Sequence, residues 1–100
     1  MGVIDIDFSK ARAQASKLDE LAGDLEKLIE NDYNMTMEQI RSNWTGESAN
    51  AYLAKGGTLE GEMKQTVSDI KGVANSIRET VDKLEEAQRR AQEVISGKNT

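Results

Sequence analysis

Carboxylates are the main side chains here that could take part in catalysis, because the sequence contains no histidine and no cysteine. Acid–base and nucleophilic chemistry at neutral pH usually uses a histidine, an activated cysteine or a carboxylate in a dry pocket. Glu85 and Glu86 are adjacent and could imitate a paired acid–base site. Each is followed four residues later by an arginine, Arg89 or Arg90, which favours a salt-bridged helix surface instead. We therefore expect a protein that is not an enzyme.

Residues that hold metals or cofactors are equally scarce. Zinc sites use Cys and His, and no run of Asp and Asn has the spacing of a calcium-binding loop. Met35 and Met37 are more typical of flexible core filling than of a ligand pair. The formal net charge is −5 without a basic cluster, which argues against nucleic acid or an anionic membrane surface as a partner. We expect no cofactor and no small-molecule substrate, so the partners should be proteins.

The first ten residues, MGVIDIDFSK, bear on where the protein works. They contain neither the basic region nor the apolar run of a signal peptide, and the run is also too short for a membrane helix. Without cysteine, disulfide usage gives no information about the compartment. If the protein leaves the cell, we expect it to do so without a cleavable signal peptide.

The only tryptophan lies in the segment RSNWTGESANAY, residues 41–52, between two stretches with helical periodicity. A tight turn between antiparallel helices needs a residue that adopts positive φ, and Gly46 supplies it. Thr45 or Ser48 could cap the following helix, and Trp44 could fold its ring over the junction and bury it against a neighbouring helix. On these residues alone, Trp44 and Gly46 are a packing lid and a hinge.

Residues from about 9 to about 43 carry the periodicity of one amphipathic helix. Asp7 or Ser9 could cap its start by accepting a hydrogen bond from a free backbone N–H. Its apolar stripe comprises Ala11, Leu18, Leu21, Leu25, Leu28 and Met35 at heptad spacing, with Ala15, Ala22 and Ile29 beside them. The segment NDYNMT, residues 31–36, is the weakest part, because Asn and Asp compete for backbone hydrogen bonds.

Residues from about 48 to about 96 predict a longer, coiled-coil-like helix. One heptad row is Met63, Ile70, Ile77, Leu84 and Ala91, and its neighbour is Leu59, Thr66, Val73, Thr80, Ala87 and Val94. The start is weak because the glycines at 56, 57 and 61 each cost about 1 kcal/mol relative to alanine. The helix could begin near Ser48 with a weak first section, or only at Thr58.

Together these helices predict an all-α protein, an antiparallel helix–turn–helix hairpin. We expect an extension at 1–8, a hairpin domain at 9–96 with its turn at 44–47, and a flexible tail at 97–100. A bare hairpin buries only one seam, whereas both apolar stripes are broad. We therefore expect a second hairpin to complete a four-helix bundle. The residues expected at the hairpin and dimer interface are Leu18, Leu21, Leu25, Leu28, Ile40, Met63, Ile70, Ile77 and Leu84.

Trp-x-Gly near the middle of about a hundred residues, between two amphipathic helices, resembles the WXG family of small proteins handled by type VII secretion systems. The match rests on Trp44 and Gly46, followed by small residues and then the aromatic Tyr52. The resemblance implies a hairpin that dimerises head-to-tail, as a homodimer or with a related small partner. It also implies recognition by a membrane-bound secretion ATPase and secretion in folded form. In this family the Trp-x-Gly tip lies near the partner's C-terminal end and contributes to a composite export signal.

One feature of the family is missing from this sequence. Many members carry Tyr-x-x-x-Asp/Glu after the second helix, but Tyr33 and Tyr52 are the only tyrosines and neither has an acid four residues later. This departure favours a heterodimer or a chaperone-like role, in which the protein pairs with the helical N-terminal domain of a larger toxin. A non-secreted helical adaptor, whose Trp-x-Gly is coincidental, is the remaining alternative.

Overall fold

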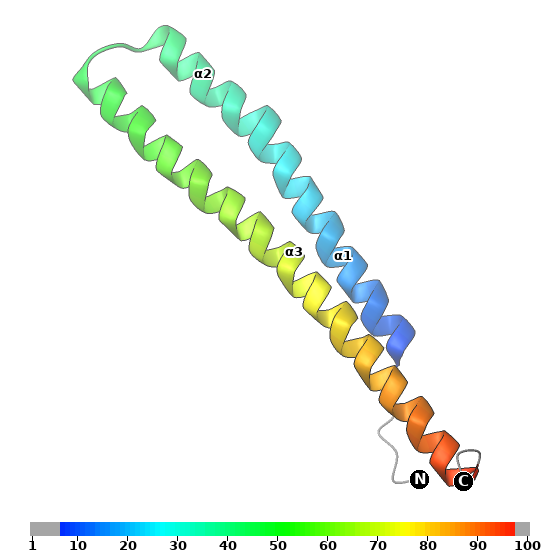
Figure 1. Ribbon diagram of the computed structural model, residues 1–100. Coiled ribbons are helices and arrows are strands. Elements are labelled where there is room, and N and C mark those ends of the chain that lie inside the picture. Colours follow the sequence, from blue (N-terminus) through cyan, green and yellow to red (C-terminus); the bar gives the residue numbers. More distant parts are fainter. Residues whose placement is uncertain (1–6, 98–100) are drawn as a thin grey trace.

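The computed structural model describes residues 7–97, which form a hairpin of helices (Figure 1). In chain order its elements are α1 (Phe8–Lys27), a π-helical segment η1 (Leu28–Tyr33), α2 (Asn34–Asn43) and α3 (Glu47–Ile95). The extension expected at 1–8 and the tail expected at 97–100 lie outside the described residues except for their innermost positions.

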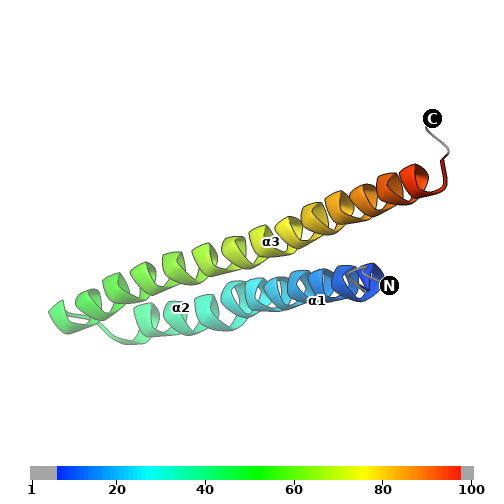
Figure 2. The same ribbon diagram turned by 90° about the horizontal axis from the view of Figure 1, so that it is seen from below.

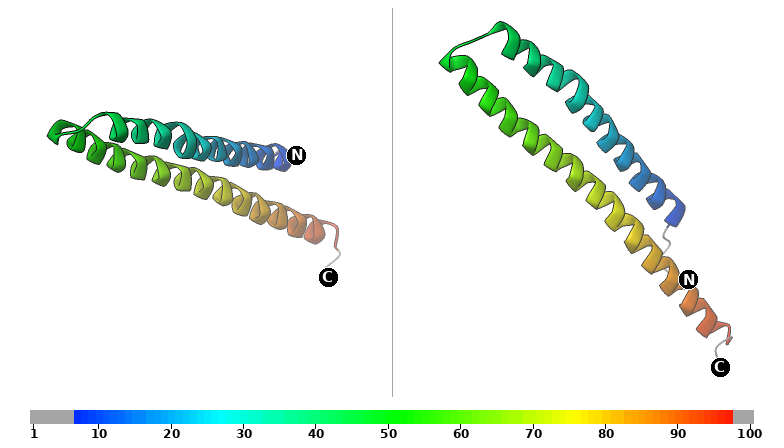
Figure 3. Two further views of the ribbon diagram at one scale, coloured as in Figure 1. Left: turned by 90° about the horizontal axis from the view of Figure 1, so that it is seen from above. Right: turned by 45° about the horizontal axis from the view of Figure 1, so that its top comes forward.

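α1, η1 and α2 follow one another as a single arm that runs antiparallel to α3 (Figure 2). The molecule measures 77 × 20 × 17 Å, and a 49-residue helix such as α3 is itself about 73 Å long at 1.5 Å per residue. α3 therefore spans almost the whole molecule and extends past the start of α1 (Figure 3). The predicted all-α hairpin is confirmed for the described residues.

The ends of the helices follow from local sequence. The Asp7 side chain, rather than Ser9, caps α1 by accepting a hydrogen bond of 3.0 Å from the backbone N–H of Lys10. α3 ends at Ile95 with Ser96 as its C-cap, and Gly97 then adopts a φ of 74° that suits the position after a helix C-cap. The glycines expected to weaken the start of α3 leave it unbroken from Glu47.

The buried seam between the two arms is made of alanines together with β-branched isoleucine and valine. Its buried members are Ala15, Ala22 and Ile29 from the first arm and Ala49, Val67, Ala74 and Val81 from α3. The sequence placed the leucine row at the centre of the stripe, with the alanines beside it. In the structure the alanines form the centre, because short side chains let the two helices approach closely, while Leu21 and Leu28 stay half-exposed.

The π-helical segment η1 lies in the part of the first arm that the sequence marks as weak. Residues facing α3 follow one another here as Leu25, Ile29, Tyr33, Met37 and Ile40, at intervals of four, four, four and three. A regular heptad alternates four and three, so one residue is extra, and a π turn accommodates one extra residue. The π turn thus keeps both halves of the arm against α3.

Gly56 marks the closest approach of α3 to the second half of the first arm. It is buried, and a Cβ atom built there would lie 2.1 Å from Met37 Cε and 3.1 Å from the Tyr33 hydroxyl. The Tyr33 hydroxyl also donates a hydrogen bond to the Gly56 carbonyl. Gly56 is therefore a contact point between the arms, and neither a kink nor merely a weak position.

Candidate functional site

The hairpin tip is built around Gly46, which occupies the N-cap position of α3. Its φ of 110° and ψ of 179° lie in a region that is essentially accessible to glycine alone. Its carbonyl accepts a hydrogen bond of 3.0 Å from the N–H of Asn50, which starts the helix. α3 begins without a side-chain cap, so neither Thr45 nor Ser48 makes the expected capping hydrogen bond. The expected role of Gly46 as a positive-φ turn residue matches its geometry.

Trp44 ends the first arm in an extended conformation, with φ of −135° and ψ of 123°. Its backbone N–H still donates a hydrogen bond of 2.9 Å to the Ile40 carbonyl, so Trp44 directly follows the last turn of α2. The ring contacts Tyr52 on α3, with centroids 5.8 Å apart and planes tilted by 55°. It does not become buried as expected: Trp44 remains 44% exposed and Tyr52 53% exposed. The tip thus presents an aromatic pair to solvent.

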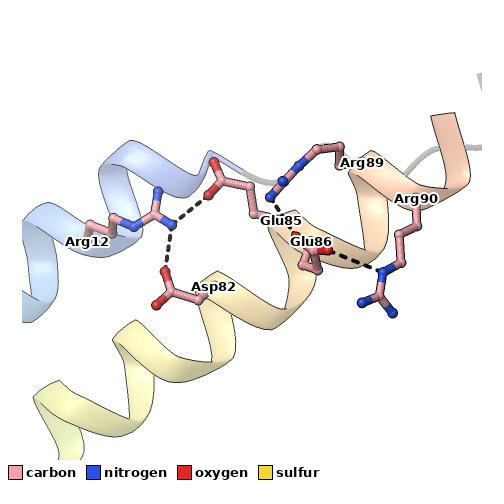
Figure 4. Close-up of polar contacts among 6 residues, drawn as sticks. All are labelled: Arg12, Asp82, Glu85, Glu86, Arg89 and Arg90. Carbon is pink, nitrogen blue, oxygen red and sulfur yellow. Dashed lines mark hydrogen bonds and ion pairs between the residues drawn. The ribbon is translucent and has the colours of Figure 1, made fainter. Parts of the chain in front are cut away.

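One edge of the hairpin carries ion pairs that cross between the arms. Arg12 contacts Asp82 at 2.8 Å and Glu85 at 2.7 Å (Figure 4). Further along, Asp19 pairs with Arg78, and Glu26 pairs with Lys71 at 2.7 Å. We call these three rungs the charged edge. Because 12, 19 and 26 are seven residues apart, as are 71, 78 and 85, the rungs repeat once per heptad.

The two members of the acidic pair of the sequence, Glu85 and Glu86, bind different arginines (Figure 4). Glu86 binds both Arg89, at 2.7 Å, and Arg90, at 3.2 Å. Glu85, expected to pair along its own helix with Arg89, instead accepts a hydrogen bond from Arg12 on the other arm. That hydrogen bond lowers the pKa of Glu85 below its ordinary value. The two carboxylates therefore serve as ion-pair acceptors.

The opposite edge of the hairpin is apolar. A groove of about 380 Å³ runs between the arms there, lined mostly by hydrocarbon. Its walls are Leu25, Leu28, Ile29, Asp32, Tyr33, Thr36, Met63 and Thr66. A second groove nearer the tip shares Tyr33 and Thr36 and continues to Tyr52 and Leu59. We call the surface on this side the open face.

The interface residues expected from sequence fall into two groups in the hairpin. Six are partly buried between the arms: Leu18, Leu25, Ile40, Met63, Ile70 and Ile77. The other three, Leu21, Leu28 and Leu84, are 41–51% exposed. Within the described residues no side chain larger than alanine is completely buried, so the hairpin has little core of its own.

Two features of the structure were not predicted from the sequence, the charged edge and the contact between Tyr33 and Gly56. The charged edge could have been found from heptad spacing of charges, since Arg12, Asp19 and Glu26 recur in the first arm as their partners do in α3. The contact of Tyr33 with Gly56 had no such signal, because it depends on the π turn. Among the described residues no group of acidic side chains is placed to hold a metal ion, and no helix is long and apolar enough to cross a membrane.

The fold and tip define a class: small helical hairpins whose turn carries Trp-x-Gly. Residues 3–89 match the protein family described as "WXG100: Proteins of 100 residues with WXG", and the chain belongs to this family. The family places the chain among small helical proteins of type VII secretion. No match to a curated protein or to a solved structure was found.

Proposed function

We propose that this protein is secreted by, or serves, a type VII secretion system as one half of a folded four-helix bundle. Its tip, with Trp44 and Gly46, contributes to what the membrane-bound secretion ATPase recognises. Family membership supports the type VII context. The observation that carries the role of the tip is the Trp44 ring, which stays 44% exposed although it is the largest apolar side chain of the chain.

An exposed tryptophan at a fixed turn suits recognition better than stability. Burying an aromatic ring is worth roughly 1.5–3 kcal/mol, and a ring that stays half in water gives up much of that gain. Exposed aromatic side chains on a rigid element are also typical hot spots of protein–protein interfaces. Gly46 allows a turn conformation that other residues rarely adopt, and across this turn Trp44 contacts Tyr52.

The partner in the bundle completes a hydrophobic core that the hairpin lacks. Leu21, Leu28, Leu59, Val73 and Leu84 are each 41–53% exposed. Exposed apolar surface of this extent along one face marks an interaction site. A second helical hairpin laid on the open face would bury these side chains.

Secretion of the Trp44→Ala variant tests the role of the tip. In a host that carries a type VII system, we expect the variant to accumulate in the cells and to fall to background in the culture medium. Circular dichroism and light scattering on the purified variant should show the same helicity and mass as the parent. Met35→Ala is the matched control, because Met35 is a large side chain on the same arm and is 62% exposed. Equal secretion of Trp44→Ala and parent would contradict a signal role.

A second candidate role is that of a chaperone or targeting partner for a larger toxin. This role is favoured by the lack of an acid four residues after either tyrosine. Met37 lies four residues after Tyr33, and Gly56 lies four residues after Tyr52. A partner chain would then supply the Tyr-x-x-x-Asp/Glu signal. Co-purification of the protein with the helical N-terminal domain of a toxin encoded nearby, and secretion only when that domain is present, would support this role.

A further inference from the structure

The half of the first arm next to the tip is held to α3 less firmly than the other half. α2 occupies this end, beside the turn (Figure 1). The buried residues of the first arm, Ala15, Ala22 and Ile29, all precede α2, which itself has no buried residue. Within residues 7–97, the ion pairs between the arms all join α1 to α3. α2 is therefore the part of the arm whose separation from α3 costs least free energy.

One set of contacts holds the start of α2 in place. The Tyr33 hydroxyl, at the end of η1, donates a hydrogen bond to the Gly56 carbonyl, and the Met37 side chain lies against the same glycine. We call these contacts of Tyr33 and Met37 with Gly56 the latch. At the other end of α2, the Trp44 ring contacts Tyr52 but stays 44% exposed. The docked position of α2 thus depends mainly on the latch.

The π turn is needed only when α2 is docked on α3. If the arm were α-helical throughout, the heptads of α1 would continue into α2 with polar residues facing α3. These residues would be Asp32, Thr36, Gln39 and Asn43. The π turn advances the face by one residue, so that Tyr33, Met37 and Ile40 meet α3 instead. Docking of α2 and formation of the π turn are therefore coupled.

Separation of α2 from α3 removes the reason for the π turn. π turns are rare within helices, and those that occur lie frequently at functional sites. When α2 leaves α3, residues 28–33 can form the ordinary hydrogen bonds of an α-helix. The recovery of α-helical geometry offsets part of the free energy that docking provides. The first arm is thus built to exchange between a docked and an open position of α2.

We propose that α2 opens from α3 at the π turn and presents its apolar stripe, ending in Trp44, to a hydrophobic groove of the secretion machinery. The proposal rests on the proposed function, because it describes how the tip is recognised. The stripe comprises Tyr33, Met37, Ile40 and Trp44, at intervals of four, three and four residues. An amphipathic helix enters a hydrophobic groove with this spacing. In the docked position the first three side chains are partly buried, and opening exposes them beside Trp44.

Hydrogen exchange followed by mass spectrometry tests the opening. In the parent, amides of residues 34–43 should exchange at least about tenfold faster than those of residues 12–26, because local opening is more frequent than global unfolding. Tyr33→Phe removes the hydrogen bond of the latch and keeps the ring, so exchange should rise in residues 34–43 alone. Tyr52→Phe is the matched control and should change neither segment. One common rate for both segments, or equal effects of the two variants, would overturn the opening.

Deletion of Asn31 tests the coupling to the π turn. Asn31 is exposed and lies within η1. Without it, the intervals after Ile29 become three, four and three, so an α-helix can dock α2 without a π turn. The Tm should therefore rise, and exchange in α2 should slow by at least about tenfold. Deletion of Asp24, also exposed and seven residues earlier, is the matched control and should lower the Tm, because α1 has no surplus residue. A loss of Tm in both deletions would overturn the coupling.

Secretion separates this proposal from the proposed function. Deletion of Asn31 keeps Trp44 and holds α2 docked, so secretion should fall by about tenfold, because recognition scales with the open fraction. A purely structural role of η1 predicts no such loss from a more stable protein. If this variant is secreted like the parent while Trp44→Ala is blocked, the opening is overturned and the proposed function stands. If Trp44→Ala is itself secreted like the parent, the proposed function fails, and the presentation of the stripe fails with it.

Discussion

At the scale of single residues, Gly46 and Gly56 have different structural roles, and the sequence around them does not show which role each one has. Gly46 is required for its backbone conformation, since a φ of 110° strains any residue with a side chain. Gly56 has ordinary helical geometry and is required for space, because Met37 and Tyr33 lie against it. Replacing each by alanine should therefore cost stability for different reasons.

Gly46→Ala should destabilise the protein by about 1–3 kcal/mol, the usual cost of forcing a side chain into this region of φ and ψ. Urea denaturation followed by circular dichroism measures the change. Gly72→Ala is the control, because a Cβ atom there meets nothing within 4 Å and the helix interior favours alanine by about 1 kcal/mol. An unchanged midpoint for Gly46→Ala would show that the turn can adopt another conformation.

Gly56→Ala and Gly57→Ala form a matched pair of neighbours in the same helix. At Gly57 a Cβ atom meets open space, so alanine should stabilise by about 1 kcal/mol through helix propensity. At Gly56 the Met37 methyl can rotate away, but the Tyr33 hydroxyl is held by its bond to the Gly56 carbonyl. We expect Gly56→Ala to be less stable than Gly57→Ala by about 1–2 kcal/mol in urea denaturation. Equal stabilities would show that the contact is loose.

At the scale of helices, the charged edge helps to determine how the arms align. If α3 slipped by one heptad in one direction, Arg12 would face Arg78; in the other direction, Asp19 would face Glu85. Each slip brings one like-charge pair together, although some opposite charges would still meet, such as Asp19 with Lys71 in the first slip and Glu26 with Arg78 in the second. Each slip would also move Gly56 away from Met37 and Tyr33, which pack against it in the observed alignment. Of these three alignments, only the observed one pairs opposite charges at every rung, so the charges favour it together with the contact at Gly56.

A double-mutant cycle at Asp19 and Arg78 measures this effect. Asp19→Arg should destabilise by placing two cations together, Arg78→Asp should do the same with two anions, and the combined variant should recover most of the loss. Partly exposed pairs of this kind are worth about 0.2–1 kcal/mol, so we expect a coupling energy within that range. A coupling energy of zero by thermal denaturation would leave alignment to the apolar seam alone.

Acidification should weaken the rung of Arg12 and Glu85. Because the pKa of Glu85 is lowered in the folded protein, its contribution is present above the ordinary value of 4.5 and is lost as the pH falls through the folded value. Glu85→Gln should therefore be less stable than the parent at pH 7, and the difference in Tm should shrink below pH 4.5. Glu20→Gln, on an exposed part of α1, controls for the change of net charge. A difference in Tm that is constant from pH 7 to pH 3 would contradict this assignment.

The sequence was sufficient to predict the two helices and the turn. It was not sufficient to predict which side of each helix faces the other arm. Heptad spacing, the absence of proline and Trp44 with Gly46 were enough to predict two helices and the turn. The same spacing placed Met35 in one stripe with Leu28, because a count of sevens assumes an α-helix throughout. The π turn at Leu28–Tyr33 adds a residue between them, and only packing against α3 determines that.

At the scale of the whole molecule, Leu28 and Met35 test whether the open face governs assembly. Tyr33 and Met37 face α3, so Met35, two residues from each, is turned away from it and is 62% exposed. Leu28 instead lines the groove. If a second hairpin covers the open face, Leu28→Asn should weaken the dimer by about 1.5–3 kcal/mol per copy, and Met35→Asn should leave it unchanged.

Because folding and association are coupled in such a pair, thermal unfolding reports the result directly. The Tm of a dimer rises with protein concentration, and Leu28→Asn should lower the Tm at concentrations where the parent is dimeric. Met35→Asn should follow the parent curve at every concentration. Equal decreases in Tm in the two variants would mean that Met35, seven residues after Leu28, also lies in the interface. A parent Tm independent of concentration would mean that the hairpin is stable by itself, in spite of its small core.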